Sequence, residues 1–207
     1  MCRPALERRE AVRGTLHIRN VNRTVGTILG VAAEAEILAA RIEAELGRIA
    51  QAMAAIRNRP SVLFLISVGR NTPMAGGADT AAATMIELAG GRNAVAELTG
   101  YKPLSAEAAV TARPDTILVM TQTLEIMGGV DAILALPALA ATPAGAAGRL
   151  VAMDGMLLLG LGPRTPQAVR ELATALHPDL DLGSQFLAPL AGQGPRQCLV
   201  PLHLAPG

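Results

Sequence analysis

A helical periodicity that continues for 25 residues constrains this chain more than any other feature of its sequence. Over residues 33–57 the apolar side chains recur every three or four positions, at Ile37, Leu38, Ile42, Leu46, Ile49, Met53 and Ile56. This spacing predicts one amphipathic helix, which would be about 37 Å long at 1.5 Å per residue. Because that exceeds the usual helix of a globular domain, we expect the segment to act as a strut rather than as a packing unit.

The flanking residues place this helix between a shorter helix and a strand. Residues 17–29 have apolar positions at helical spacing, and Gly30 can end that helix. Pro60 stops the long helix, and residues 61–67 are apolar on both faces, which is typical of a buried strand. Residues 1–14 show no periodicity, so we predict an unstructured leader there.

The rest of the chain alternates between strand and helix patterns. Further strands are predicted over 116–120 and 149–153, and helices over 80–89, 106–112, 122–136 (interrupted at Gly128–Gly129) and 165–177. Loops are predicted over 68–78, 136–139, 142–145 and 156–161. The alternation predicts an α/β fold, in which a three-layer lobe with a mostly parallel sheet follows a long connecting helix. We expect a helical segment over 15–59, an α/β lobe over 60–178 and a disordered tail over 179–207, where prolines and glycines recur.

Composition excludes several classes of function. The formal net charge is +1 and aromatic residues make up 1% of the chain, so neither phosphate attraction nor base stacking favours nucleic acid. Cys2 and Cys198 lie near opposite ends, and the three histidines are far apart, so no metal-ligand spacing appears. No apolar run reaches the length of a membrane helix.

The amino-terminal residues only loosely resemble an export signal. Six arginines fall within the first 24 residues, and a short apolar run follows over 25–33. The basic region is too long, however, and contains Glu7 and Glu10. We therefore predict no convincing signal peptide.

Two loops carry the candidate ligand-binding residues. The 68–78 loop follows a strand and precedes a helix, the place where ligands bind in open α/β sheets. Arg70 can meet an anion there, beside the N–H groups near Asp79, which we expect to cap the next helix. Met74 is the one methionine placed to act as a soft ligand. The loop matches no nucleotide-binding motif.

The second loop contains Tyr101, which can ligate haem iron through its phenolate, and Lys102, which can pair with a carboxylate. A lone tyrosine is also commonly a packed residue with a solvated hydroxyl. Glu107 lies in the first turn of a helix capped by Ser105, where it suits the helix dipole and can also dock an arginine of a partner. No catalytic motif is found, so we predict a protein that is not an enzyme.

Several segments, in order, resemble haemin-binding periplasmic proteins of bacterial ABC transporters. They are Leu88-Ala-Gly-Gly-Arg-Asn93, Gly100-Tyr-Lys-Pro-Leu-Ser-Ala-Glu107, Ala112-Arg-Pro-Asp-Thr-Ile-Leu-Val119, Val151-Ala-Met-Asp154 and Leu159-Gly-Leu-Gly-Pro-Arg-Thr-Pro166. The resemblance covers roughly residues 20–178. It implies two α/β lobes joined by a long rigid helix, the helical-backbone class of periplasmic binding proteins, of which this chain has the helix and the carboxyl-terminal lobe.

The resemblance implies a substrate-binding component, here apparently partial or truncated, that presents haem to a membrane permease from the periplasm. Haem is then a transported ligand, no catalytic cofactor is needed, and contact with the membrane complex is peripheral. Glu107 resembles the glutamate that docks on the permease. The family's usual tyrosine ligand belongs to the lobe that is absent, so only Tyr101 is available as an iron ligand, with Lys102, Arg70 and Met74 as further ligand contacts. We expect the 68–78, 101–102 and 156–161 loops to form this half of the haem cleft.

Two alternatives stay open. The same architecture carries ferric siderophores or corrinoids, because a fold does not determine a ligand. A fragment that binds no ligand would keep only the permease-docking surface. In either case the long helix would expose an apolar stripe through which copies of the chain can self-associate.

Overall fold

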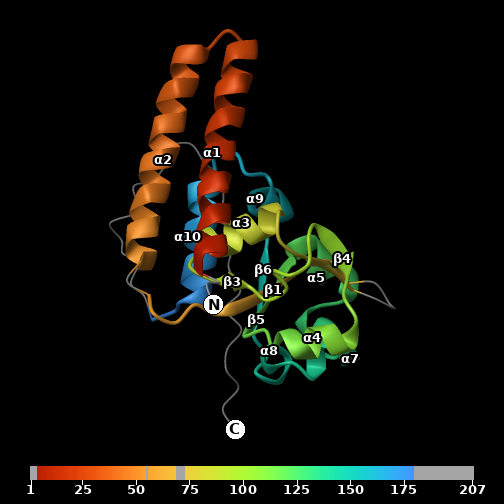
Figure 1. Cartoon of the computed structure of the whole chain (residues 1–207). Coiled ribbons are helices and arrows are strands. Elements are labelled where there is room, and N and C mark those ends of the chain that lie inside the picture. The colour runs from red at the N-terminus through yellow and green to blue at the C-terminus, as the bar shows by residue number, and fades with distance from the viewer. Residues whose placement is uncertain (1–3, 55, 69–72, 180–207) are drawn as a thin grey trace.

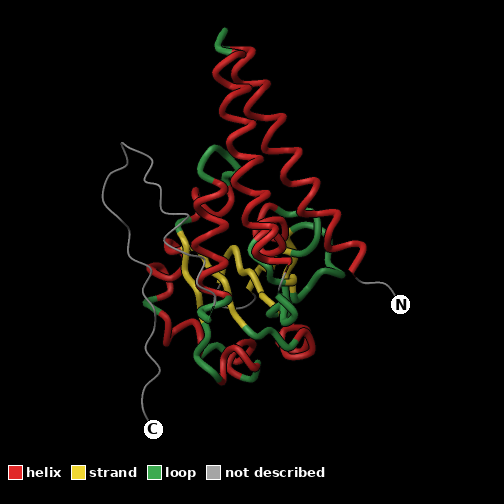
Figure 2. The backbone as a smooth tube through the Cα atoms, turned by 90° about the vertical axis from the view of Figure 1, so that its left-hand side faces the viewer, coloured by secondary structure: helices red, strands yellow, loops and turns green. Residues whose placement is uncertain are grey.

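A pair of long helices projects from a compact α/β lobe in the computed structural model of the chain (Figure 1), which describes residues 4–54, 56–68 and 73–179. The elements in chain order are α1 (Pro4–Ile28), α2 (Ala32–Ala54), β1 (Ser61–Val68), β2 (Pro73–Gly76), α3 (Ala81–Leu88), β3 (Arg92–Asn93), β4 (Tyr101–Pro103), α4 (Ala106–Ala112), β5 (Thr116–Met120), α5 (Thr121–Met127), α6 (Val130–Leu134), α7 (Pro137–Ala140), α8 (Pro143–Ala146), β6 (Leu150–Met153), α9 (Gly155–Leu159) and α10 (Thr165–Leu176). Helices lie on both sides of the sheet (Figure 2), so the predicted three-layer α/β lobe is confirmed.

The two long helices α1 and α2 form an antiparallel hairpin. Gly30, at a φ of +74°, makes the turn between them, a backbone conformation that glycine adopts without strain. Gly26 is buried so closely against Ala35 that a methyl group added at Gly26 would overlap the Ala35 side chain. Further along, Arg19 forms an ion pair with Glu43 at 3.1 Å. The long helix predicted over 33–57 is therefore one arm of a hairpin.

The prediction of an unstructured leader over 1–14 is wrong for residues 4–14, which belong to α1. Pro4 opens the helix at a position where its missing N–H is not needed. Gly14 packs directly against Thr84 of α3. The helix thus lies on the lobe, and this tertiary contact stabilises a segment that carries no periodic signal of its own.

The sheet has the strand order β4-β2-β1-β5-β6, and β3 pairs with the beginning of β1. Strands β1, β5 and β6 are parallel, and β3 is parallel to β1. Strand β2 runs antiparallel to both β1 and β4. The mostly parallel sheet is confirmed, but β2 and β4 replace segments that we predicted as loops, because each is only three or four residues long and has little alternating pattern.

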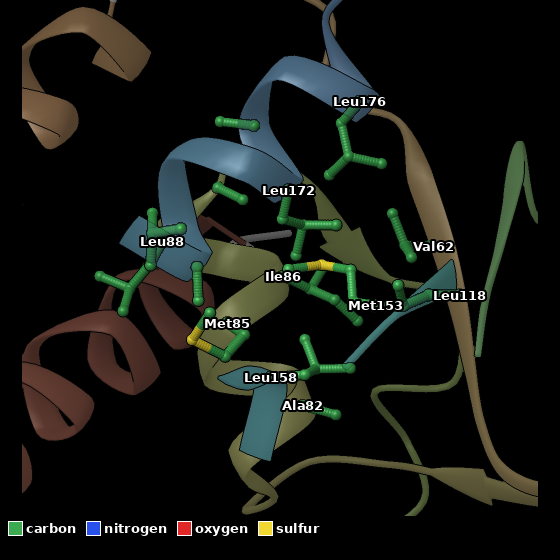
Figure 3. Close-up of a cluster of buried hydrophobic side chains, with 14 of the residues drawn as sticks. Val62, Ala82, Met85, Ile86, Leu88, Leu118, Met153, Leu158, Leu172 and Leu176 are labelled. Carbon is green, nitrogen blue, oxygen red and sulfur yellow. The ribbon is translucent and has the colours of Figure 1, made fainter. Parts of the chain in front are cut away.

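Two hydrophobic clusters bury the two faces of the sheet. In β1, Phe64 points into the first cluster and Leu63 and Leu65 into the second, as the alternation of a strand requires. The first cluster (Figure 3) packs the sheet against α3, α9, α10 and the inner side of the hairpin and contains Ile18, Ile42, Leu46, Ile49, Val62, Phe64, Ala82, Met85, Ile86, Leu88, Ala89, Leu118, Met153, Leu158, Ala168, Val169, Leu172, Ala173 and Leu176. The second cluster contains Leu63, Leu65, Val68, Ala75, Val95, Leu104, Ala109, Ile117, Val119, Ile133, Leu139, Ala144 and Leu150.

Three predicted loops contain short helices instead. Residues 136–139 and 142–145 overlap α7 and α8, each opened by a proline, and residues 156–161 overlap α9. Each helix places one apolar side chain into the core, Leu139, Ala144 and Leu158 respectively. Too few residues are involved for a helical period to show in the sequence. The predicted tail lies outside the described residues from position 180 on, and the division of the chain into separate domains stays a prediction.

His177 closes the carboxyl end of α10 inside the lobe, next to Gly90 at the end of α3. The side chain is buried, and burial lowers the pKa of His177 from its usual value of 6.5. The positive charge of Arg59 lowers that pKa further, while the carbonyl groups of Gly90 and Ala89 oppose the shift in part. The folded protein therefore favours the neutral imidazole.

A pH-dependent stability follows from this lowered pKa. The stabilisation is fully present above the unfolded-state pKa of His177 and is lost as pH falls toward the lower folded-state value. We expect the melting temperature to drop more between about pH 7.5 and about pH 5 in the unsubstituted protein than in His177→Gln, which does not titrate in this range. Circular dichroism melts at both pH values measure this, and equal drops would contradict it.

Candidate functional site

The parallel strands β1, β5 and β6 end at one edge of the sheet, which we call the carboxyl edge. Leu65 is level with Val119, and Met120 with Met153. In open α/β sheets ligands bind outside this edge. Helix α5 begins directly after β5, and α9 begins two residues after β6, so both border the candidate site. Residues 69–72 follow β1 and lie outside the described residues, and the predicted anion contact Arg70 is among them.

A polar pair joins the beginnings of α5 and α9 at the carboxyl edge. Nε2 of Gln122 donates to Oδ2 of Asp154 at 3.3 Å, and Oε1 of Gln122 accepts from the N–H of Gly155 at 3.3 Å. The other carboxylate oxygen of Asp154 accepts from the N–H of Leu157 at 2.8 Å and so caps α9. The pair positions both helices against the ends of their strands.

Sequence reasoning missed both members of this pair. Asp154 precedes a short apolar run, which is the usual signal of a helix N-cap, and the signal could have been used to place α9. Nothing comparable marks Gln122, because its role depends on the β5 and β6 ends lying side by side. The same reasoning misplaced a cap elsewhere, since Thr80 rather than Asp79 caps α3 by accepting from the N–H of Ala83.

Two large apolar side chains stand exposed beside the polar pair. Ile126 lies one helical turn after Gln122 in α5 and is 84% exposed. Met156 directly follows Gly155 in α9 and is 73% exposed. Met156 begins the 156–161 segment, which the sequence predicted to help form the haem cleft, whereas Ile126 was not singled out as a ligand contact. The carboxyl edge therefore presents polar groups in its centre and apolar groups beside them.

The β2–β4 ladder shows how three predicted ligand residues are arranged. Met74 pairs with Pro103, Ala75 with Lys102, and Gly76 with Tyr101. Residues directly opposite one another share a face of the sheet, whereas neighbours along a strand alternate. Met74 and Tyr101 therefore lie on the same face, while Lys102 points to the other. The structure thus places Met74 and Tyr101 diagonally across one face of the ladder and Lys102 on the other face.

Tyr101 packs half-buried against the first cluster. A methyl group added at Gly76 would come within 2.9 Å of Cδ1 of Phe64 and 3.3 Å of Cε1 of Tyr101, so the two rings lie close over this glycine. Burial raises the pKa of the Tyr101 phenol above its usual value of 10.0. The free protein therefore holds a neutral phenol here, and ligation to iron would have to displace its proton. The ligand role of Tyr101 stays a prediction.

Glu107 lies where the sequence predicts it, in the first turn of α4. Ser105 caps this helix by accepting from the N–H of Ala108 at 3.1 Å, and Ala109 is the buried residue of the helix. The Glu107 side chain is exposed. Its carboxylate is thus presented at the surface by a short rigid element, and its docking role stays a prediction.

Two negative findings concern the described residues alone. In that part of the chain no helix is long and apolar enough to cross a membrane. Within the same residues no group of three or more His, Cys, Asp or Glu side chains could hold a metal ion. The Tyr101 hypothesis is unaffected, because haem iron already has four ring nitrogens and needs only axial ligands from a protein.

The structure is an α/β lobe from which a pair of long helices projects, with a carboxyl edge of the kind where ligands bind in open α/β sheets. The family model described as periplasmic binding protein matches residues 6–157. The chain therefore belongs to the periplasmic binding protein family. No curated protein matches the sequence significantly.

Solved structures of periplasmic haem-binding proteins are similar to this chain. RhuT from Roseiflexus sp. RS-1, solved in its apo form, is 42% identical with a TM-score of 0.73, and the match covers 77% of this chain and 62% of RhuT. BhuT, solved in complex with two haems, is 37% identical with a TM-score of 0.73 and coverage of 78% and 63%. HutB of Vibrio cholerae is 35% identical with a TM-score of 0.66 and coverage of 75% and 61%. The chain thus spans less than two thirds of the length of each.

Proposed function

We propose that this chain is part of the substrate-binding component of a bacterial ABC importer and that its transported ligand is haem. The observation that carries the proposal is the 42% identity to a periplasmic haem-binding protein over 77% of this chain. The matched family region also includes the hairpin, the sheet and the carboxyl edge. On this proposal the chain works in the periplasm, binds a ligand rather than transforming it, and hands the ligand to a membrane permease.

Other ligands stay as alternatives. Ferric siderophores and corrinoids are carried by proteins of the same architecture, and a fold alone does not select among them. Haem is favoured because RhuT, BhuT and HutB, at 35 to 42% identity, are all haem-binding proteins. A chain that binds no ligand and keeps only a docking surface would be distinguished by a direct titration.

Among the described residues, Tyr101 is the residue that we propose as an axial ligand to the haem iron. It is the only tyrosine in the chain, and a phenolate is a recognised haem ligand. Because burial raises the pKa of this phenol, coordination must release a proton that the free protein holds firmly. Binding through Tyr101 should therefore become tighter as pH rises.

A haemin titration followed by Soret absorbance tests the ligand and its iron contact together. We expect a saturable Soret shift, with an affinity that increases between about pH 7 and about pH 9. Tyr101→Phe keeps the packed ring and removes the oxygen, so it should weaken binding about tenfold or more and flatten the pH dependence. A shift retained unchanged in Tyr101→Phe would assign Tyr101 to packing alone. No saturable shift in the unsubstituted chain would contradict haem binding.

Glu107 is the residue that we propose to dock on the permease. Its carboxylate is exposed on a helix whose beginning is held by the Ser105 cap. An exposed carboxylate of this kind is well suited to a bidentate contact with an arginine of a partner. The contact would orient the lobe on the membrane complex without burying much of its surface.

Charge reversal at Glu107 tests this docking surface. We expect Glu107→Arg to weaken binding to a detergent-solubilised haem-importer permease about tenfold or more, because an attractive charge pair becomes repulsive. Glu97→Arg makes the same change at another exposed glutamate and serves as the control. Haemin binding should be the same in both variants. Equal permease affinity of the two variants in a pull-down would contradict the assignment.

The apolar stripe that we expected the long helix to expose is largely buried in the first cluster, at Ile42, Leu46 and Ile49. We therefore propose that copies of this chain associate through the end of the hairpin instead. Six large apolar side chains near its turn are at least 41% exposed, namely Val21, Val25, Ile28, Leu29, Val31 and Ile37, which we call the hairpin patch. Two charged pairs beside them are formed within the hairpin, Arg23 with Glu36 and Arg19 with Glu43. These four charges are balanced within each copy, so apolar contact can draw two copies together, and pairing two hairpins would form a four-helix arrangement.

Sedimentation velocity over a range of concentrations tests this association. We expect the unsubstituted chain to sediment as a dimer. The double variant Ile28→Asp with Ile37→Asp should sediment as a monomer, because the dimer interface would then bury unpaired charges. Val110→Asp changes an exposed apolar residue outside the hairpin patch and should leave the dimer intact. A monomeric unsubstituted chain would contradict the proposal.

A further inference from the structure

Three exposed large apolar side chains lie on the α/β lobe, within the residues that the structure describes. Val110 of α4 is 39% exposed, whereas Ile126 and Met156 are 84% and 73% exposed. The two most exposed ones are therefore the two that border the carboxyl edge. Val110 does not border that edge, because its helix α4 leads into the beginning of β5, at the opposite end of the strand.

Ile126 and Met156 approach the carboxyl edge from opposite faces of the sheet. Leu124 and Met127 of α5 pack against the second cluster. Leu158 of α9 is buried in the first cluster. The two helices thus lie on different sides of the sheet, and the exposed side chains Ile126 and Met156 border its edge on either side.

The Gln122–Asp154 pair connects these two sides. The hydrogen bonds from Gln122 to Asp154 and from Gly155 to Gln122 hold the first turns of α5 and α9 together. Ile126 is one turn, about 6 Å, along α5 from Gln122, and Met156 is the second residue after Asp154. From one side of the sheet to the other, its end therefore presents the apolar Ile126, the polar Gln122–Asp154 pair and the apolar Met156.

We propose that Ile126 and Met156 form two apolar contacts for the ring of the bound haem, one on each side of the carboxyl edge. This inference rests on the proposed function and adds residues to it. A porphyrin ring is large, flat and apolar, so contacts spaced across an edge suit it better than a small polar solute. The unbranched thioether side chain of Met156 adapts its shape to such a surface.

The charge of Asp154 orients the ligand on this surface. The carboxylate lies between the two apolar contacts and carries the same sign as the haem propionates. Like charges repel most strongly where solvent is excluded. The haem therefore binds with its methyl and vinyl edge toward Gln122 and Asp154 and with its propionates directed away from them.

Titrations of haemin and of metal-free protoporphyrin test the contacts separately from iron coordination. We expect Ile126→Glu and Met156→Glu each to weaken the binding of both ligands at least about fivefold, because each variant removes apolar burial and adds a negative charge. Met156→Leu should bind both ligands like the unsubstituted chain, since it stays apolar. Val110→Glu adds the same charge away from the edge and is the matched control. All three positions are exposed, so melting curves should confirm unchanged folding in the four variants.

The outcomes separate this inference from the proposal on which it rests. In one outcome the unsubstituted chain binds haemin, and Ile126→Glu and Met156→Glu bind it as tightly as Val110→Glu does. That result would overturn the two contacts while leaving haem binding intact. A loss in Met156→Leu as large as in Met156→Glu, seen with haemin and absent with protoporphyrin, would replace the apolar contact by iron coordination. No binding by the unsubstituted chain would overturn both the proposed function and this inference.

Discussion

The two-sided burial of β1 is the constraint on which the rest of the structure depends. Phe64 fills one face and Leu63 and Leu65 fill the other, so helices must cover the sheet on both sides. The same strand pairs with β2, β3 and β5. Its direction therefore determines where the parallel strands end and where a ligand can approach.

The edge that results combines rigidity with exposed apolar groups. Helix α9 is held at its beginning by Asp154 and in its middle by the burial of Leu158, which leaves Met156 outside. On the other face, the buried Thr123 of α5 donates to the carbonyl of Ile66 at 3.3 Å. Because these anchors are local, they hold the backbone of α5 and α9 at the edge, which lowers the ordering cost of binding there.

Long elements were predictable from the sequence and short ones were not. The amphipathic period over 33–57 and the apolar run over 61–67 each extend over enough residues to identify α2 and β1. In contrast, β4 consists of Tyr101 to Pro103, a stretch too short for any period. For this reason the segment with Tyr101 and Lys102 was predicted as a loop. The structure shows a strand instead, and the two side chains point in opposite directions.

Local pattern and the order of motifs were enough to predict the α/β class, the long helix, the place of Glu107 in a capped helix and the resemblance to haemin-binding periplasmic proteins. That residues 4–14 continue a helix depends on a tertiary contact, because Gly14 packs against Thr84 of α3. Tertiary structure also placed Gln122 beside Asp154. These residues are 32 positions apart, and only the parallel pairing of β5 and β6 brings them within hydrogen-bonding distance.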